Sequence, residues 1–159
     1  MKKITFCINT AKNEKDYINL LLTSMEKHFD SLEHEVIIFI DSDNQNTFKF
    51  LTERENKFKD IRILKNKLPV PIGYAPNINL MFEEAKNDIV SFIQSDMVVG
   101  KSYDSEILRH LKDEKTIVSA TRVEPSLHPP SPEKYTKDLG LSPDEFDWNT
   151  FNTFVAFNT

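Results

Sequence analysis

Polar side chains follow three of the chain's apolar segments, and they are the residues whose types could do chemistry. They are Asn9, Thr10 and Glu14 after residues 4–8, Asp41 and Asp43 after residues 36–40, and Gln94, Ser95 and Asp96 after residues 89–93. Carboxylate oxygens suit hard divalent cations such as Mg²⁺ and Mn²⁺. Asp41, Asp43 and Asp96 on one rim could hold such a cation, and the cation could in turn hold a pyrophosphate group.

The acids at these positions also have an ordinary structural interpretation. Acidic residues after strands often cap the next helix or form turns. Spacing alone favours neither interpretation for Asp43. Asp96 fits the metal-binding role better, because no helix is expected to begin directly behind it.

The apolar segments predict the strands of a sheet, because short runs rich in β-branched side chains are typical of strands buried on both faces. The runs are residues 4–8, 36–40, 61–64 and 89–93. Helical patterns lie between them: one with Asn13 as its N-cap, one over residues 47–58, and one beginning at Pro76. The third is predicted to turn four side chains inward: Ile78, Met81, Phe82 and Ala85.

Strands and helices therefore alternate along the chain. Right-handed crossovers between such strands give a mostly parallel sheet with helices on both faces. The expected fold is a doubly wound, Rossmann-like α/β domain. Ligands of such folds bind beyond the carboxyl ends of the strands, which is where the polar residues described above are expected to lie.

The composition changes after residue 122. A helix over residues 105–112 and a fifth strand over residues 116–122 are predicted to complete the core. The next ten residues contain four prolines, which cannot pair within a central strand, so a loop is expected there. We predict a core at residues 1–122, followed by a Pro-rich loop and the beginning of a further region at residues 123–159. The domain is therefore expected to be truncated.

Composition excludes several classes of protein. A chain of 159 residues is long enough to bury one hydrophobic core without disulfides. Its net charge of −5 argues against binding to duplex nucleic acid. The sequence has no apolar run long enough for a membrane span, and its single cysteine, Cys7, lies in an apolar segment. A cytoplasmic protein is expected.

The order and spacing of four segments resemble the family 2 glycosyltransferases with a GT-A fold. The four segments are residues 4–14, 35–43, 73–77 and 89–96. The first looks like the family's opening strand and nucleotide-binding turn, and the last looks like the strand that carries its Asp-x-Asp metal motif. The resemblance implies that Asp41 contacts the nucleobase, and that Gly73 and Asn77 belong to a turn and helix that line the nucleotide site.

The resemblance also implies a reaction. A nucleotide-diphosphate sugar would donate its sugar to an acceptor hydroxyl on a glycan, a protein or a lipid-linked molecule, with inversion and with help from Mn²⁺ or Mg²⁺. Asp96 would bind the metal ion. Asn9, Thr10, Glu14, Asp43, Gln94 and Ser95 would join Asp41, Gly73 and Asn77 in binding the donor.

Two features depart from the family pattern. Gln94 stands where the metal motif has its first acid, so Asp96 is the only residue to which the resemblance assigns metal binding. The catalytic base of inverting members lies well downstream of that motif, where this chain offers only Asp144, Glu145 and Asp147, and none of them can be assigned.

Three alternative functions compete with this reaction. A nucleotide-sugar-binding domain without transferase activity would explain both departures. A nucleotidyltransferase would need a glycine-rich phosphate loop near the first strand, and residues 9–14 contain no glycine. A Rossmann dehydrogenase is disfavoured for a similar reason, since no G-x-G-x-x-G motif follows any strand.

Overall fold

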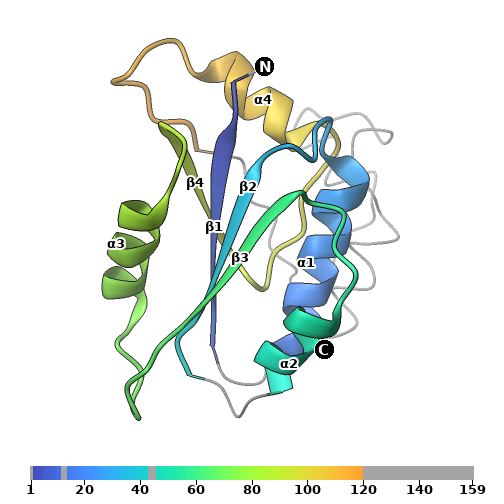
Figure 1. The fold of residues 1–159 in the computed structure, drawn as a ribbon. Helices are drawn as coiled ribbons and strands as arrows, with labels where there is room; N and C mark the ends of the chain where they lie inside the picture. Colours follow the sequence, from blue (N-terminus) through green and yellow to red (C-terminus); the bar gives the residue numbers. More distant parts are fainter. Residues whose placement is uncertain (1, 12–13, 43–45, 120–159) are drawn as a thin grey trace, which may run out of the picture.

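The computed structural model of the chain describes residues 2–11, 14–42 and 46–119. Four strands form one parallel sheet in the order β3-β2-β1-β4 (Figure 1). The strands are β1 (Ile4–Thr10), β2 (Glu35–Ile40), β3 (Asp60–Lys65) and β4 (Ile89–Gln94). The predicted parallel α/β architecture is therefore confirmed over the described residues.

Helices cover both faces of the sheet, as predicted. They are α1 (Lys15–His28), α2 (Asn46–Glu53), α3 (Tyr74–Glu84) and α4 (Tyr103–His110). Figure 1 shows α1, α2 and α4 on one face and α3 on the other. None of the helices in the described part of the chain is long and apolar enough to cross a membrane.

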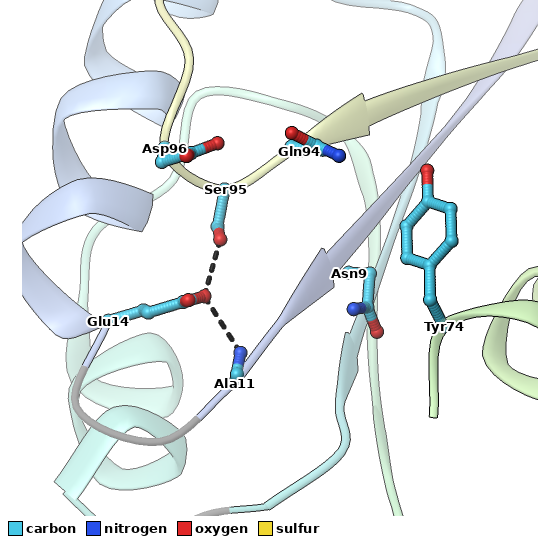
Figure 2. A pocket seen from close by; sticks show the side chains of 7 residues that line it. All are labelled: Asn9, Ala11, Glu14, Tyr74, Gln94, Ser95 and Asp96. Carbon is cyan, nitrogen blue, oxygen red and sulfur yellow. Dashed lines mark hydrogen bonds between the residues drawn. The ribbon is translucent and has the colours of Figure 1, made fainter. Parts of the chain in front are cut away.

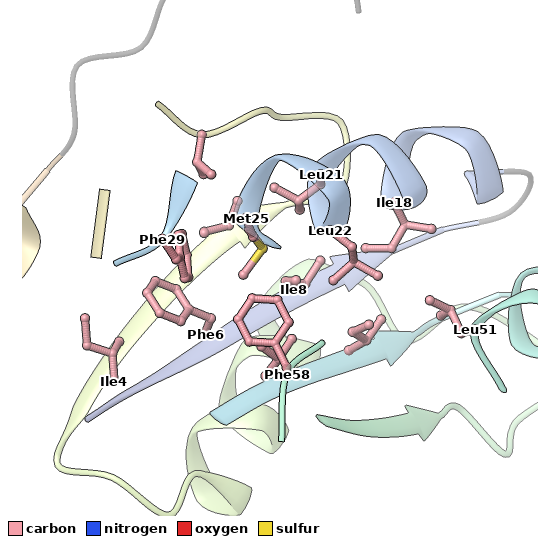
Figure 3. Packing of buried hydrophobic residues seen from close by; sticks show 14 of the residues in the cluster. Ile4, Phe6, Ile8, Ile18, Leu21, Leu22, Met25, Phe29, Leu51 and Phe58 are labelled. Carbon is pink, nitrogen blue, oxygen red and sulfur yellow. The ribbon is translucent and has the colours of Figure 1, made fainter. Parts of the chain in front are cut away.

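The larger hydrophobic core lies between the sheet and α1 (Figure 3). Alternate residues of β1, namely Ile4, Phe6 and Ile8, point into this core and are fully buried. They meet Leu21, Leu22 and Met25 of α1, among others. A smaller core on the opposite face joins Cys7, Ile37, Phe39 and Met81. The two-residue period of each strand thus supplies both cores.

The strand order places a crevice at one end of β1. The chain passes from β1 to β2 and β3 on one side, and then crosses back to place β4 on the other side of β1. This reversal between β1 and β4 is a topological switch point, where helices leave opposite faces and ligands of open α/β sheets bind. Asn9 and Gln94 are register partners at this end of the two strands.

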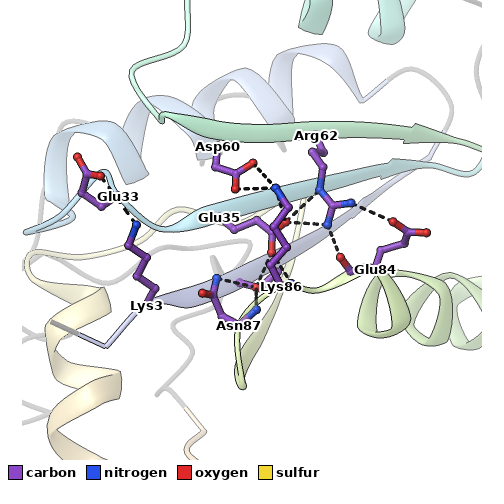
Figure 4. Close-up of polar contacts among 9 residues, drawn as sticks. Lys3, Glu33, Glu35, Asp60, Arg62, Glu84, Lys86 and Asn87 are labelled. Atoms are coloured by element: carbon purple, nitrogen blue, oxygen red, sulfur yellow. Dashed lines mark hydrogen bonds and ion pairs between the residues drawn. The ribbon is translucent and has the colours of Figure 1, made fainter.

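A buried carboxylate holds the opposite end of the sheet together (Figure 4). Glu35 is 1% exposed, and it accepts hydrogen bonds from the Thr5 hydroxyl, the Lys86 backbone N–H and the Arg62 guanidinium. Burial raises the pKa of Glu35, but these hydrogen bonds outweigh it and leave the pKa below its ordinary value. Glu35 therefore ties β1, β2, β3 and the end of α3 into one unit.

A buried aspartate, Asp104, and a buried histidine, His34, fix α4 near the amino ends of the strands. Asp104 is fully buried and accepts hydrogen bonds from His34 Nε2, over 3.0 Å, and from the backbone N–H groups of Asp30 and Ser31. The Ile4 N–H donates to Nδ1 of His34, so that nitrogen carries no proton and the proton lies on Nε2. His34 thus links β1 to the first turn of α4.

The structure corrects several sequence-based boundaries. β1 continues to Thr10, because Asn9 and Thr10 pair with β2. α2 ends at Glu53 instead of residue 58, although Phe58 still packs in the larger core. α3 begins at Tyr74, and Pro76 lies in its first turn, where its missing N–H is tolerated. α1 begins at Lys15 with Glu14 in the N-cap position, and the predicted cap, Asn13, lies outside the described residues.

Two further predictions about burial and strands are wrong. Phe82 is 61% exposed, because α3 faces the sheet with Asn77 and Met81, and Phe82 lies about 100° further round the helix. The described part of the predicted fifth strand, residues 116–119, forms no strand, and Ile117 is 94% exposed. The predicted domain boundary after residue 122 lies outside the described residues.

Candidate functional site

A pocket lies at the carboxyl ends of β1 and β4 (Figure 2). Its lining consists of Asn9, Ala11, Glu14, Tyr74, Gln94, Ser95 and Asp96. The fold thus brings five predicted site residues together from two segments about eighty residues apart. The pocket occupies the switch point of the sheet, where the sequence predicts a ligand.

Glu14 connects the two loops that form this pocket. Its Oε2 atom accepts a hydrogen bond from the Ala11 N–H over 2.7 Å and from the Ser95 hydroxyl over 2.5 Å. Ser95 is buried, whereas Asp96 beside it is exposed. The backbone turn closed by Met97 N–H on the Gln94 carbonyl places Asp96 on the outside. Asp96 is therefore a solvent-facing carboxylate on a loop that Glu14 holds in place.

Asp41 lies just after β2 and is surrounded by donors from its own chain. Its carboxylate accepts the N–H groups of Ile72 and Gly73, each over 2.9 Å, and the Asn66 amide over 3.0 Å. Burial raises the pKa of Asp41, but hydrogen bonds from Ile72, Gly73, Asn77 and Asn66 outweigh it and lower the pKa below its ordinary value. Asp41 is ionised at neutral pH and holds the chain between β3 and α3.

Gly73 occupies a backbone conformation that favours glycine. Its φ angle is 90°, and it precedes the first residue of α3. This conformation lets the Gly73 N–H point at Asp41 while its carbonyl accepts the Asn77 N–H. Gly73 therefore shapes the turn that leads from the Asp41 carboxylate into α3.

Three predicted site residues lie behind the pocket or outside the described chain. Asn77 is fully buried in α3, and its amide donates to the Asn9 side chain over 2.9 Å. Thr10 is fully buried at the end of β1, and its carbonyl accepts the Asp41 N–H. Neither side chain lines the pocket. Asp43 lies outside the described residues.

Tyr74 is a pocket residue that sequence reasoning missed. It is the first residue of α3, it is 48% exposed, and Figure 2 shows its ring across the pocket from Glu14 and Asp96. The signal in the sequence is an aromatic residue directly after a glycine that precedes a helix. Tyr74 reaches the pocket because α3 begins at Tyr74 instead of Pro76.

The described residues hold no cluster of three or more His, Cys, Asp or Glu side chains that could bind a metal ion. Mg²⁺ is usually bound through one or two carboxylates together with substrate phosphates. Asp96, exposed at the pocket rim, fits that arrangement as the single protein carboxylate, and the side-chain oxygen of Gln94 is a second hard ligand of the kind such ions accept.

The sequence matches the family model described as "Glycosyl transferase family 2" over residues 7–158, which is nearly its whole length. The chain belongs to glycosyl transferase family 2. No curated protein sequence matches this one closely enough to count as a relative.

Solved structures of other chains share the fold. The chain is similar to TarS of S. aureus, with a TM-score of 0.58 and 23% identity over 69% of this chain and 19% of TarS. It is also similar to TarS residues 1–349 in complex with UDP-GlcNAc, with a TM-score of 0.58, 21% identity, and coverage of 69% of this chain and 31% of that one. The same fragment in complex with UDP gives a TM-score of 0.57, 22% identity, and coverage of 69% and 32%. The chain thus spans about a third or less of the TarS chains that it matches.

Proposed function

We propose that this chain binds the nucleotide-sugar donor of a glycosyltransferase in the pocket between β1 and β4. The observation that carries the proposal is the position of that pocket at the switch point of a family 2 fold, with Asp96 exposed at its rim. The TarS fragment with the same fold binds UDP and UDP-GlcNAc, which supports a uridine nucleotide as the first ligand to test.

Each lining residue has a role in this proposal. The diphosphate lies beside Asp96, the Asn9 amide faces the bound nucleotide, and the Gln94 amide offers hydrogen bonds to a ribose or sugar hydroxyl. The ring of Tyr74 packs against the nucleoside, as exposed aromatic rings commonly do with flat ligands. Glu14 and Ser95 position the loops, because their hydrogen-bonding atoms already bind each other.

The sequence-based role for Asp41 changes within this proposal. Both carboxylate oxygens of Asp41 accept hydrogen bonds from the chain itself, and the residue is 8% exposed. We infer that Asp41 acts on the nucleotide through the turn that it holds, which carries Gly73 and Tyr74. Thr10 and Asn77 support the same wall from behind the pocket.

Asp96 is the residue that would hold a divalent cation. Mg²⁺ or Mn²⁺ bound there with the donor diphosphate would offset the charge of the departing nucleoside diphosphate. The chain's own contribution is to fix this carboxylate at the pocket rim, through the turn at residues 94–97 and the Glu14–Ser95 hydrogen bond.

Transfer in this proposal inverts the anomeric carbon. The acceptor hydroxyl loses its proton to a general base as its oxygen attacks that carbon, and the bond to the diphosphate oxygen breaks on the opposite face. Asp144, Glu145 and Asp147 lie outside the described residues, so no residue is assigned as the base. In this proposal the acceptor is a hydroxyl of a glycan, a protein or a lipid-linked molecule, and the reaction takes place in the cytoplasm.

Calorimetric titration tests the donor site. UDP, GDP and several of their sugar conjugates are titrated into the 159-residue chain with Mn²⁺ and with EDTA. Binding of a nucleotide that strengthens with Mn²⁺ is the expected result. Absence of binding by every nucleotide under both conditions would overturn the proposal.

A binding domain without transferase activity is the second candidate, and Gln94 favours it. The family's metal motif has an acid at this position, so a neutral amide there lowers the charge available to hold a catalytic cation. A donor-hydrolysis assay separates the two candidates. Release of free sugar from a bound donor indicates a competent enzyme, whereas binding without release indicates a binding domain.

A further inference from the structure

Two side-chain amides form a pair at the back of the pocket. Nδ2 of Asn77 donates a hydrogen bond to Oδ1 of Asn9 over 2.9 Å. Asn77 is fully buried in α3, whereas Asn9 lines the pocket at the end of β1. Each amide has a donor end and an acceptor end, so the direction of one amide sets the direction of the other.

The ionised carboxylate of Asp41 agrees with this direction of the Asn77 amide. An ionised carboxylate only accepts hydrogen bonds. Burial raises the pKa of Asp41, and the hydrogen bonds that lower it again include one from the Asn77 side chain, whose NH₂ group must be the donor. If the Asn77 amide turned over, its NH₂ group would lose its acceptor, Oδ1 of Asn9. In the observed direction, only its Oδ1 lacks a partner among the described residues.

The direction of Asn9 follows from that of Asn77. Because Oδ1 of Asn9 accepts from Asn77, its NH₂ group is the end that remains for the pocket. Figure 2 shows the Asn9 nitrogen facing the side of the pocket with Ala11 and Glu14, and the oxygen turned towards α3. Asn77 of α3 thus decides which end of the Asn9 amide a ligand meets.

We propose that Asn77 is a positioning residue that makes Asn9 a fixed hydrogen-bond donor to an acceptor oxygen of the bound nucleotide. This inference rests on the proposed donor site and assigns a chemical preference to one wall of it. A ligand with an oxygen acceptor at that wall is favoured, and a ligand with a donor there is disfavoured, because Asn9 cannot turn over without breaking its bond to Asn77. The acceptor oxygen is an atom either of the nucleoside, in its base or ribose, or of the diphosphate.

The first test replaces the donor with an acceptor while keeping the bond to Asn77. Asn9→Asp retains an oxygen for the Asn77 amide but presents an oxygen to the pocket. Gln94→Glu is the matched control, because it makes the same amide-to-carboxylate change on the register partner across the same pocket. Binding is measured in EDTA, so that neither new carboxylate gains a metal ion, with UDP, uridine and pyrophosphate as separate ligands. NMR spectra follow weak binding and report the fold of each variant.

Asn9→Asp is expected to weaken UDP binding about tenfold more than Gln94→Glu, since it replaces a hydrogen bond with repulsion between two acceptors. A loss that also appears with uridine assigns the acceptor to the base or ribose, and a loss that appears with pyrophosphate assigns it to the diphosphate. Equal weakening by the two variants would overturn the inference while leaving the donor site intact. A wild-type chain that binds none of the three ligands, in EDTA or with Mn²⁺, would overturn the donor site and the inference with it.

The second test asks whether Asn77 acts through Asn9. Asn77→Leu removes the orienting amide at similar volume, and Asn9→Ala removes the group that is oriented. We expect Asn77→Leu to weaken UDP binding in the wild-type chain and to have almost no effect on binding in the Asn9→Ala chain. An equal loss of UDP affinity in both backgrounds would show a merely structural role. If Asn77→Leu does not fold, the comparison of Asn9→Asp with Gln94→Glu still decides the inference.

Discussion

The hydroxyl of Ser95 donates a hydrogen bond to the carboxylate of Glu14, from which it is separated by 81 positions in the sequence. The same carboxylate oxygen accepts the Ala11 N–H. This pair joins the loop after β1 to the loop after β4, and the second loop carries Asp96. The shape of the pocket rim therefore depends on a contact that involves no ligand.

Ser95→Ala tests this contact. Loss of one hydrogen bond costs about 1 kcal/mol of free energy. We therefore expect the affinity for UDP in the presence of Mn²⁺ to fall roughly fivefold, because the loop that carries Asp96 loosens. Ser105→Ala on α4, away from the pocket, is the control and should bind UDP as the wild type does. Titration calorimetry measures both, and unchanged affinity in Ser95→Ala would remove Glu14 and Ser95 from the supporting structure of the site.

Gln94→Asp tests the departure from the family's metal motif. A second carboxylate beside Asp96 gives a hard cation another charged ligand, so Mn²⁺-dependent binding of UDP should become tighter by about tenfold or less. Binding in EDTA should become weaker, because the added charge then repels the diphosphate. Titrations under both conditions measure the change. Weaker binding in the presence of Mn²⁺ would indicate that Gln94 donates a hydrogen bond directly to the diphosphate.

Met81→Ala and Phe82→Ala test the corrected face of α3. Met81 is 1% exposed within the smaller core, so its truncation should lower the free energy of unfolding by about 2–5 kcal/mol. Phe82 is 61% exposed, so its truncation should change stability by no more than about 0.5 kcal/mol. Urea denaturation measures both variants. A larger loss for Phe82→Ala than for Met81→Ala would show that the face of α3 with Phe82, and not the face with Met81, packs against the sheet.

Asp104→Asn tests the buried pair beneath α4. The variant puts an NH₂ group among three donors and weakens the bond to His34, so the free energy of unfolding should fall by on the order of 3 kcal/mol at pH 7. Asp88→Asn, an exposed change at the start of β4, is the control and should be close to the wild type.

The pH dependence of that loss follows from the pKa of Asp104. Burial raises this pKa, but hydrogen bonds from His34, Asp30, Ser31 and Ser105 outweigh it and leave the pKa below its ordinary value of 3.8. A lowered pKa in the folded state stabilises the fold above the unfolded pKa, and that stability is lost as the pH falls below about 3.8. The difference between the wild type and Asp104→Asn should therefore shrink in that acidic range. A difference that grows there would contradict the assigned ionisation of Asp104.

Local pattern is sufficient to predict the four strands of the sheet, although it also predicts a fifth strand whose described residues, 116–119, form none. The β-branched runs at residues 36–40 and 89–93 form strands because each can bury side chains on both faces, and alternation with helices then leads to a parallel order. The end of β1 was less predictable, since Asn9 and Thr10 are polar yet continue the ladder with β2. The inward face of α3 was mispredicted at Phe82 because hydrophobicity alone does not distinguish a core residue from an exposed one.

The site was predictable only in part. Residues such as Gln94 and Asp96 were placed at the pocket because strand ends in a parallel sheet share one edge. The bond between Glu14 and Ser95 and the donors around Asp41 were not predictable, since they depend on how distant loops fold over that edge. Tyr74 was missed because its role depends on the first residue of a helix, which a pattern locates only to within a few residues.

The most direct measurement is nucleotide binding by Asp96→Ala compared with Asp88→Ala. Both residues are exposed carboxylates at opposite ends of β4, so neither change should unfold the chain. Calorimetric titration with UDP, with Mn²⁺ and with EDTA, should show that Asp96→Ala loses the Mn²⁺-dependent part of the affinity while Asp88→Ala retains it. If Asp96→Ala binds UDP with Mn²⁺ as tightly as the wild type, Asp96 does not bind the metal ion, and the donor diphosphate does not lie beside it.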